Sequence, residues 1–273
     1  MVQLLVFDAD DTLYHWLTYY VPSFYAMAEE VSRLTNIPLS TLLPEYKAVH
    51  TALQNVEYPY ATLKLPSLRE WYGKEDEEGM KQALAPALDA FKTTRAKTLQ
   101  LYPHVRETLE QIRDMGIPMV VYSDASPENL VQRLGQLGID GFFESVYARR
   151  RGYYQGEEDS RAYIFDEPKP SPSNLLTICK NQGVLPENTL FVGDSIAKDV
   201  YMAHLAGVKS AWCCYGRQNC EELYRKLVDI TSWTEEDFQK DRAQKAIVAE
   251  QGITPTYTIS QFDRLLQVLQ EEK

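Results

Sequence analysis

Cysteine and histidine are scarce in this sequence. Its 273 residues include four cysteines and four histidines, and so few cysteines do not form the disulfide framework of a small secreted protein. Cys213 and Cys214 are neighbours in an apolar run and would point to opposite faces of a strand. The histidines show no metal-ligand spacing. We therefore expect buried free thiols and neither disulfides nor a soft-metal site.

Long apolar stretches are also absent. No stretch approaches the roughly 20 apolar residues that a membrane-spanning helix needs. The first residues, Met1–Asp8, lack the basic start and long apolar segment of a signal peptide, and they are predicted to form a strand. These features predict a cytoplasmic protein that has no membrane partner.

Basic residues are fewer than acidic residues. The chain has 28 Lys and Arg against 39 Asp and Glu, which gives a formal net charge of −11. An acidic protein repels nucleic acid and anionic membranes, so we expect no nucleic-acid partner. An anionic substrate would need a cation or a few well-placed basic side chains, which favours a metal-assisted site. No feature of the sequence predicts an oligomeric state.

What the sequence does contain is an alternation of short apolar runs with helical patterns. The predicted strands are Leu4–Phe7, Met119–Tyr122, Ser145–Ala148, Leu190–Val192, Ser210–Cys214 and Tyr257–Ile259. The predicted helices between them, each ending at or near a glycine, are Val105–Met115, Glu128–Leu137 and Ser173–Asn181. This alternation predicts an α/β protein with a Rossmann-like parallel sheet core.

One region interrupts the alternation. Residues 16–99 contain helical stretches but no good strand candidate, and they are rich in aromatic residues, most of which we expect to pack between helices. We predict an all-helical domain inserted after the first strand, with residues 1–15 and 100–273 forming the sheet domain. The sheet domain has two excursions. Residues 149–165 are expected to form a loop or long hairpin, and residues 217–252 to include a helix that starts near Thr234 and Asp237.

Acidic and hydroxyl side chains follow three of the predicted strands. Asp8 and Asp10 follow the first strand, Ser123 follows the second, and Asp194 with the nearby Asp199 follows the run that ends at residue 192. In open α/β sheets, ligands bind outside the carboxyl ends of the strands. We therefore expect these side chains to form one site.

So many carboxylates cannot lie together as bare anions without a cation or large pKa shifts. Magnesium, a hard ion that keeps several waters, suits a site with few protein ligands. With the repulsion removed, one of Asp8 and Asp10 can attack phosphorus while the other moves protons. Lys169, stiffened by the flanking Pro168 and Pro170, can neutralise the phosphoryl oxygens.

These elements resemble, in order and spacing, the four motifs of the haloacid dehalogenase-like (HAD-like) hydrolase superfamily. The motifs are Asp8-Ala9-Asp10-Asp11-Thr12-Leu13, Ser123, Lys169 and Gly193-Asp194-Ser195-x-x-x-Asp199. The helical insertion resembles the C1-type cap domain of that family. The resemblance implies a magnesium-dependent phosphatase that acts on a small phosphorylated metabolite, such as a sugar phosphate, phosphoglycolate or a nucleotide.

The resemblance also implies a role for each motif residue. Asp8 would be the nucleophile that forms an aspartyl-phosphate, and Asp10 would be the general acid and base. The phosphate-binding residues would be Thr12, which also steadies the first loop, Ser123 and Lys169. The magnesium ligands would be Asp8, the backbone carbonyl of Asp10, Asp194 and, close behind, Asp199.

Two residues depart from the family's pattern, and other functions compete. Asp11 stands where the family usually has glycine, and Asp124 where it usually has asparagine or glycine. A dehalogenase is disfavoured, because the dehalogenases that resemble this chain lack an acid at the position of Asp10. A phosphomutase would use the same acid and is an alternative, as is a catalytically silent binding protein on the same scaffold.

Overall fold

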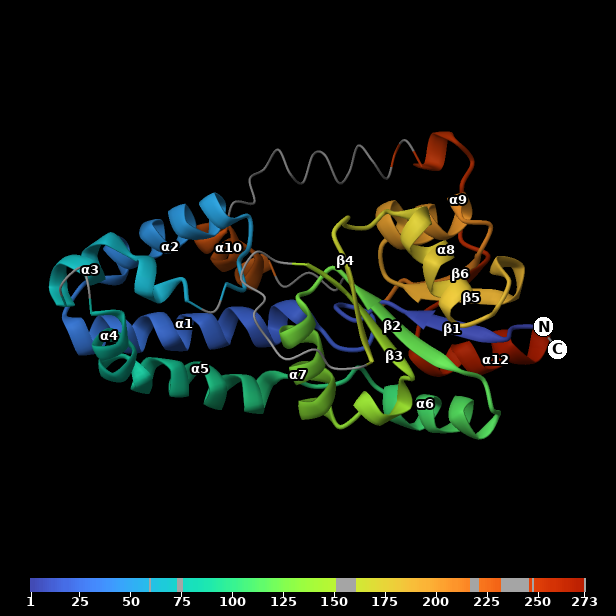
Figure 1. The fold of residues 1–273 in the computed structure, drawn as a ribbon, viewed down its shortest axis with the longest axis horizontal. Helices are drawn as coiled ribbons and strands as arrows, with labels where there is room; N and C mark the ends of the chain where they lie inside the picture. The colour runs from blue at the N-terminus through green and yellow to red at the C-terminus, as the bar shows by residue number, and fades with distance from the viewer. Residues whose placement is uncertain are drawn as a thin grey trace. The chain divides into compact units, whose positions relative to one another are not determined.

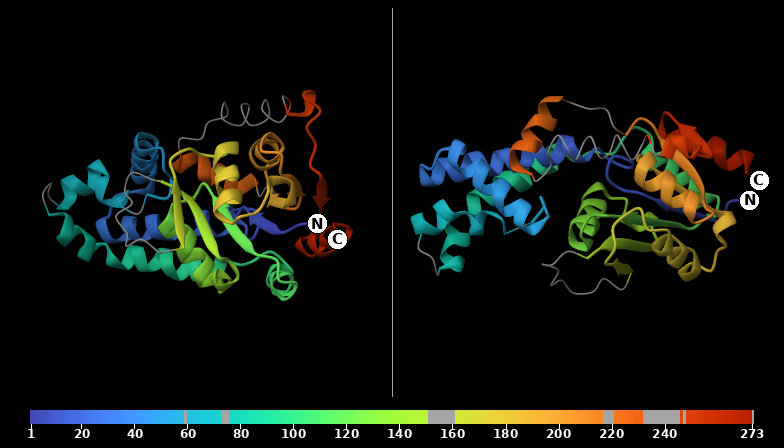
Figure 2. Two further views of the ribbon diagram at one scale, coloured as in Figure 1. Left: turned by 45° about the vertical axis from the view of Figure 1, so that its right-hand side comes forward. Right: turned by 90° about the horizontal axis from the view of Figure 1, so that it is seen from above.

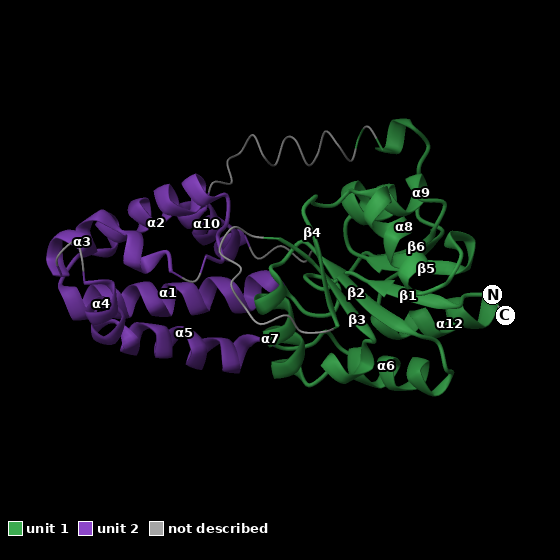
Figure 3. Cartoon of the chain, in the orientation of Figure 1, with its two compact units in different colours: residues 1–15, 100–218, 239–273 green, residues 16–99, 219–238 purple. Residues whose placement is uncertain are grey.

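The computed structural model describes residues 1–58, 60–72, 76–150, 161–216, 221–231, 246 and 248–272. The chain forms two compact units (Figure 3). Unit 1 comprises Met1–His15, Gln100–Gln218 and Gln239–Lys273, and unit 2 comprises Trp16–Leu99 and Asn219–Phe238. The chain therefore leaves unit 1 twice, after residue 15 and after residue 218.

Unit 1 is built on a seven-stranded sheet with the strand order β4-β3-β2-β1-β5-β6-β7 (Figure 1). Its strands are β1 (Leu4–Phe7), β2 (Met119–Ser123), β3 (Ser145–Arg149), β4 (Ala162–Phe165), β5 (Thr189–Gly193), β6 (Lys209–Cys213) and β7 (Tyr257–Ile259). Every neighbouring pair is parallel. The predicted α/β fold with a parallel sheet is confirmed.

Helices cover both faces of this sheet. α8 and α9 lie on one face, whereas α6 and α12 lie on the other (Figure 1; Figure 2). The helical segments of unit 1 are α6 (Val105–Asp114), α7 (Pro127–Leu137), η2 (Asp140–Phe142), α8 (Pro172–Asn181), η3 (Pro186–Asn188), η4 (Ile196–Val200), α9 (Tyr201–Leu205), η5 (Phe262–Arg264) and α12 (Leu265–Glu271). A sheet covered on both faces buries alternate residues on each side, so its strands read as continuous apolar runs.

Strand β1 shows this burial on both faces. All four of its residues are fully buried. Leu4 and Val6 share a core cluster with Ile178 of α8 and Met202 of α9, whereas the ring of Phe7 lies 5.9 Å from that of Phe262 in η5. Successive side chains of a strand point to opposite faces, so β1 links the two hydrophobic layers of unit 1.

The direction of the chain through the sheet reverses at β1. From β1 the chain runs outward through β2, β3 and β4, and β5 then returns to the other side of β1. In open α/β sheets, ligands bind at the carboxyl ends of the strands between which the order reverses. Phe7 pairs with Val192, so the residues that follow β1 and β5, including Asp8 and Asp194, emerge side by side at this edge of the sheet.

The outermost strand, β4, corrects one prediction. Residues 149–165 were expected to form a loop or long hairpin, but residues 162–165 form β4, which runs parallel to β3 with Tyr147 paired to Tyr163; residues 151–160 lie outside the described residues. The rings of these two tyrosines stack at a centroid distance of 4.8 Å. The four residues of β4 are apolar, but they follow a polar segment that contains Gly152 and Gly156, and this context favours a loop.

Unit 2 contains helices and no strand in residues 16–58, 60–72, 76–99 and 221–231. Its helical segments are α1 (Trp16–Thr35), α2 (Leu39–Leu53), η1 (Thr62–Lys64), α3 (Pro66–Tyr72), α4 (Glu77–Ala83), α5 (Ala85–Thr98) and α10 (Glu221–Ile230). Helix α1 packs along α5. Tyr20, Phe24 and Tyr46 are buried and in ring contact, so aromatic residues form part of the helix-packing core, as expected.

Helix α10 joins unit 2 through the carbonyl groups near its end. The ammonium of Lys47 donates to the carbonyl of Val228 (2.8 Å), and Nδ1 of His50 lies 2.6 Å from the carbonyl oxygen of Ile230. The last carbonyls of a helix have no partner within the helix. Side chains of α2 therefore satisfy the end of a helix that lies far away in the sequence.

The two compact units differ from the predicted domain division in one segment. Residues 217–252 were assigned to the sheet domain, whereas residues 219–238 cluster with unit 2. An amphipathic pattern indicates that a helix packs against something, but it does not indicate which element covers it. Thr234 and Asp237, the predicted start of a helix, lie outside the described residues.

Two further expectations can be compared with the structure. Cys179 and Cys213 are buried free thiols, whereas Cys214 is exposed, so the prediction of burial was wrong for Cys214, whose side chain turns away from the core. Cys220 lies outside the described residues. Among the helices that the structure describes, none is both long and apolar enough to cross a membrane.

Candidate active site

The loop after β1 holds Asp8 in a buried position. Asp8 is 5% exposed, and its backbone N–H donates to the carbonyl of Val192 in β5 (2.9 Å). The hydroxyl of Thr12 donates to Oδ2 of Asp8 (3.1 Å), while the N–H of Leu13 donates to the carbonyl of Ala9 (2.9 Å). A tight turn therefore follows the strand and fixes one oxygen of Asp8.

Asp11 has an unusual backbone conformation in this turn. Its φ of 59° lies in the left-handed region, where a side chain normally costs about 1–2 kcal/mol and where aspartate is tolerated better than most residues. Its N–H donates to the carbonyl of Tyr14 (2.7 Å). This conformation explains why glycine would suit the position and why aspartate can replace it.

Lys169 lies between two acidic side chains. Its ammonium donates to Oδ1 of Asp8 (2.5 Å) and to Oδ1 of Asp199 (2.8 Å), and the lysine is buried. Burial alone would disfavour the ammonium, but the carboxylates of Asp199, Asp8 and Asp124 outweigh it and raise the pKa of Lys169 well above its usual value. Lys169 therefore stays charged.

Asp194 and Asp199 come from the segment that follows β5. Asp199 lies in η4, a π-helical turn, and its Oδ2 accepts a hydrogen bond from the N–H of Ser195 (2.9 Å). Gly193 is required at the end of β5, since a Cβ there would lie 2.5 Å from Oδ2 of Asp199. The indole of Trp212 donates to the backbone carbonyl of Asp194 (2.7 Å). These contacts hold both acids beside β1.

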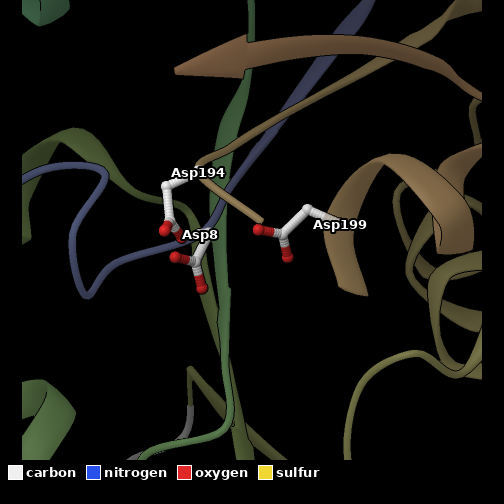
Figure 4. A group of neighbouring side chains, drawn as sticks. All are labelled: Asp8, Asp194 and Asp199. Carbon is white, nitrogen blue, oxygen red and sulfur yellow. The ribbon is translucent and has the colours of Figure 1, made fainter. Parts of the chain in front are cut away.

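The side chains of three aspartates lie close together (Figure 4). Asp8, Asp194 and Asp199 each offer a carboxylate oxygen, and these oxygens all lie within 4.8 Å of one another. Their exposed fractions are 5%, 9% and 2%. Burial, followed by the negative charges of Asp199 and Asp194, raises the pKa of Asp8 well above its usual value. The single positive charge of Lys169 does not balance the three carboxylates, so the cluster keeps an excess of negative charge.

The donor set fits a hard divalent cation. Carboxylate oxygens are the ligands that magnesium prefers, and magnesium binds through few protein ligands while keeping waters. A cation among Asp8, Asp194 and Asp199 would remove the like-charge repulsion that raises the pKa of Asp8. The structure thus contains a buried aspartate cluster that could bind a metal ion.

Ser123 and Asp124 end the neighbouring strand β2. Ser123 is buried, and its hydroxyl accepts a hydrogen bond from the N–H of Ala125 (3.1 Å). Asp124 accepts one from the backbone N–H of Lys169 (2.9 Å) and one from the ammonium of Lys198 (3.3 Å). Burial would raise the pKa of Asp124, but Lys198 and Lys169 lower it. Asp124 is therefore a carboxylate that anchors the segment carrying Lys169.

Asp10 makes a contact that the sequence did not predict. Its Oδ1 accepts a hydrogen bond from Nη1 of Arg133 (2.6 Å), and Arg133 is 2% exposed. The Asp10 side chain is 29% exposed, so it is more accessible than Asp8. The printed sequence offers no signal for this pair, because Arg133 lies in a helix more than 100 positions away.

A second group of unpredicted residues supports the first loop. The hydroxyl of Tyr215 donates to the carbonyl of Thr12, and that of Tyr102 donates to the carbonyl of Gly216, both at 2.8 Å. A Cβ on Gly216 would lie 2.0 Å from the carbonyl oxygen of Asp11. The chain after β6 therefore packs directly on the loop, and Gly216 permits this close approach.

Comparison with known proteins identifies the family of the chain. A family model described as haloacid dehalogenase-like hydrolase matches residues 2–207. This segment includes the candidate residues from Asp8 to Asp199. It also includes residues 16–99, which are inserted between β1 and α6.

Two curated relatives are phosphatases. The glyceraldehyde 3-phosphate phosphatase of Methanopyrus kandleri is 29% identical over 255 residues, which cover 90% of this chain and 96% of that protein. The phosphoglycolate phosphatase of Pseudomonas putida is 34% identical over 142 residues, which cover 52% of this chain and 46% of that protein. The match with the second relative thus extends over about half of its length.

A solved structure shares the fold. The 2-haloacid dehalogenase from Pseudomonas syringae pv. Tomato DC3000 aligns over 100% of both chains, with a TM-score of 0.58 and 20% sequence identity. At this identity the likeness concerns the fold alone.

Proposed function

Because the chain belongs to the haloacid dehalogenase-like hydrolase family, we propose that it is a magnesium-dependent phosphatase that hydrolyses small phosphorylated metabolites through an aspartyl-phosphate. The observation that carries this proposal is the buried cluster of Asp8, Asp194 and Asp199, in which Asp8 and Asp199 accept hydrogen bonds from the ammonium of Lys169. Bound magnesium would supply positive charge that offsets the carboxylates and the phosphate oxygens.

In the proposed first step, an oxygen of Asp8 attacks the phosphorus of the substrate. A bond forms between that oxygen and phosphorus, and the bond from phosphorus to the leaving oxygen breaks. Asp10 gives a proton to the leaving oxygen, so that the product departs as an alcohol. In the second step Asp10 accepts a proton from water, which attacks the same phosphorus and releases phosphate from Asp8.

The basic and hydroxyl groups around Asp8 would bind the phosphoryl group. Lys169 keeps its charge because of its carboxylate partners, so it can offset charge on the phosphoryl oxygens. Ser123 lies at the carboxyl end of β2, beside β1, and its hydroxyl can donate to a phosphoryl oxygen. Thr12 holds Oδ2 of Asp8 (3.1 Å) and thereby orients the attacking carboxylate.

The first candidate substrates are the phosphates of two- and three-carbon compounds. The relatives named as glyceraldehyde 3-phosphate phosphatase and phosphoglycolate phosphatase support this class. The test measures inorganic phosphate released from these two compounds, from sugar phosphates and from nucleotides, each with magnesium and with a chelator. Magnesium-dependent release of phosphate is expected. Phosphate transfer within one sugar, without release of inorganic phosphate, would show a phosphomutase.

Magnesium should stabilise the folded protein through the aspartate cluster. Binding at 100 times Kd adds about 2.7 kcal/mol, which corresponds to a rise in Tm of roughly 5–10 °C in a chain of this size. The Asp194→Ala variant should lose this rise. Without magnesium it should melt at or above the Tm of the parent, because the substitution removes one like charge from the cluster.

The matched control for this measurement is Asp114→Ala. Asp114 lies at the end of α6 with its side chain 67% exposed and paired to Arg113, so this variant should keep the full magnesium-dependent rise. An equal rise in Asp194→Ala and in the parent would place the ion elsewhere.

Asp10→Asn should separate the two proposed steps. With p-nitrophenyl phosphate the leaving group needs no proton, so attack by Asp8 proceeds while hydrolysis of the phosphoenzyme lacks its general base. We expect a burst of about one nitrophenol per site and then a steady rate reduced by at least ~10²-fold. Rapid-quench measurement of nitrophenol reports both phases.

An alkyl phosphate is the control for this burst. Its leaving oxygen needs a proton, so Asp10→Asn should show no burst with it. If Asp10→Asn hydrolyses p-nitrophenyl phosphate at the steady rate of the parent, Asp10 is not the general base.

A further inference from the structure

Arg133 connects the helix after β2 to the first loop of the site. Helix α7 begins at Pro127, and the side chain of Ser126 caps it by accepting a hydrogen bond from the N–H of Asn129. Arg133 lies two turns along this helix and is 2% exposed. Its Nη1 donates to Oδ1 of Asp10 at 2.6 Å. The guanidinium therefore points from α7 to the carboxylate of Asp10.

Tyr14 lies beside Arg133 and is part of the same group of side chains. Nη1 of Arg133 lies 3.3 Å from the Tyr14 hydroxyl, and the guanidinium carbon lies 6.0 Å from the centre of the Tyr14 ring. Burial, followed by the negative charge of Asp10, raises the pKa of Tyr14 well above its usual value, so the hydroxyl stays neutral. The carbonyl of Tyr14 accepts a hydrogen bond from the N–H of Asp11, which ties the group to the first loop.

A buried arginine is a costly way to pack a helix. Removing a charge from water is unfavourable unless a partner and hydrogen bonds compensate for it, and an apolar side chain of similar volume often packs as well or better. Packing of α7 thus gives no reason for a guanidinium at position 133. The partly exposed Asp10 carboxylate is a charged partner of this guanidinium, at 2.6 Å.

The geometry points to Arg133 as a positioning residue for Asp10, an inference that rests on the proposed function of Asp10. By holding Oδ1, Arg133 restricts the rotation of the carboxylate on a side chain that solvent can reach. Proton transfer requires heavy atoms about 2.6–3.2 Å apart, and a displacement of about 1 Å can cost on the order of 10²-fold in rate. Asp10 needs this placement in both proposed steps.

The test compares two leaving groups in Arg133→Met and Arg133→Lys. With an alkyl phosphate (glyceraldehyde 3-phosphate, or the alkyl phosphate that the parent hydrolyses fastest), Arg133→Met should lose ~10- to 10²-fold in kcat/KM. With p-nitrophenyl phosphate, kcat/KM should fall by less than about 3-fold, because attack by Asp8 needs no acid there. With p-nitrophenyl phosphate, kcat and KM of Arg133→Met should fall by similar factors. Arg133→Lys keeps a cation and should lie between Arg133→Met and the parent.

Because both substrates are measured on one preparation, the ratio of their kcat/KM values does not depend on how much of the variant is folded. The matched structural control is Arg106→Met. Arg106 donates to the carbonyls of Leu137 and Gly138 at the end of α7, so this variant disturbs the helix without touching Asp10 and should leave the ratio unchanged.

A double variant that combines Arg133→Met with Asp10→Asn tests whether Arg133 acts through Asp10. If Arg133 acts through Asp10, adding Arg133→Met to Asp10→Asn should lower kcat/KM for the alkyl phosphate by less than about a further 2-fold. Equal losses for both substrates, or an undiminished loss in the Asp10→Asn background, would overturn the inference. A parent without magnesium-dependent activity would instead overturn the proposed function, and that result is seen before any Arg133 variant is made.

Discussion

Asp8→Asn should abolish the hydrolysis of p-nitrophenyl phosphate in the presence of magnesium, with a loss of at least ~10⁴-fold in kcat. An amide nitrogen or oxygen cannot replace the carboxylate that attacks phosphorus. The fold should survive, because Asp8 is buried among like charges and asparagine has nearly the same shape. Lys169 keeps Asp199 as a partner at 2.8 Å, so the ammonium does not lose all of its compensation. We expect a Tm equal to or above that of the parent.

The control is Asp114→Asn, which changes an exposed acid on α6 and should retain the activity of the parent. The measurement is a steady-state assay with magnesium, accompanied by a thermal melt of each variant. Substantial activity in a folded Asp8→Asn variant would contradict the assignment of Asp8 as the nucleophile.

Lys169→Met should remove activity and also destabilise unit 1. The ammonium that lies 2.5 Å from Asp8 and 2.8 Å from Asp199 would be replaced by an apolar group. Removing one partner of a buried ion pair leaves an uncompensated charge, and such changes cost about 3–5 kcal/mol of folding free energy. Chemical denaturation measures this loss. Magnesium should restore part of the stability, because the ion supplies positive charge to the same carboxylates.

Lys198→Met is the matched control for this substitution. Lys198 is about half exposed and bonds to Asp124 at 3.3 Å, so its removal should cost no more than about 1 kcal/mol. If Lys169→Met and Lys198→Met have similar effects on stability, the buried cluster does not depend on the charge of Lys169.

Much of the sheet and of the candidate site can be predicted from the sequence. The strands are short and apolar because both faces of the sheet are covered, and the strand-end rule places Asp8 and Asp194 at one edge. The structure brings Asp8, Lys169 and Asp199 into direct contact. Their roles in catalysis, and the cytoplasmic location expected from the N-terminal sequence, stay predictions.

The residues that support the site could not be predicted in this way. Arg133 has the spacing of an ordinary helix residue, and a charged side chain in an amphipathic helix is normally assigned to solvent. Gly216 follows the end of β6 after Cys214 and Tyr215, in a turn, where glycine is common. Only the tertiary fold brings Arg133 to Asp10 and Gly216 to Asp11, because these contacts join segments far apart in the chain.

Two elements escaped prediction for a different reason. Strand β4 is an apolar run of four residues at the edge of the sheet, and the polar segment before it favours a loop. Helix α10 is amphipathic, but its pattern does not show that α2 supplies His50 and Lys47 to its final carbonyls. In both cases the local sequence is compatible with the structure and does not identify the partner.

The most direct test of the central claim is the location of the phosphoryl group on the enzyme. Asp10→Asn is mixed with p-nitrophenyl phosphate and magnesium, quenched in acid, reduced with borohydride and digested for mass spectrometry, since borohydride converts an aspartyl-phosphate into homoserine. The account predicts homoserine at position 8 and its absence when Asp8 is also replaced by asparagine. Modification at any other residue, or turnover without a phosphoenzyme, would contradict it.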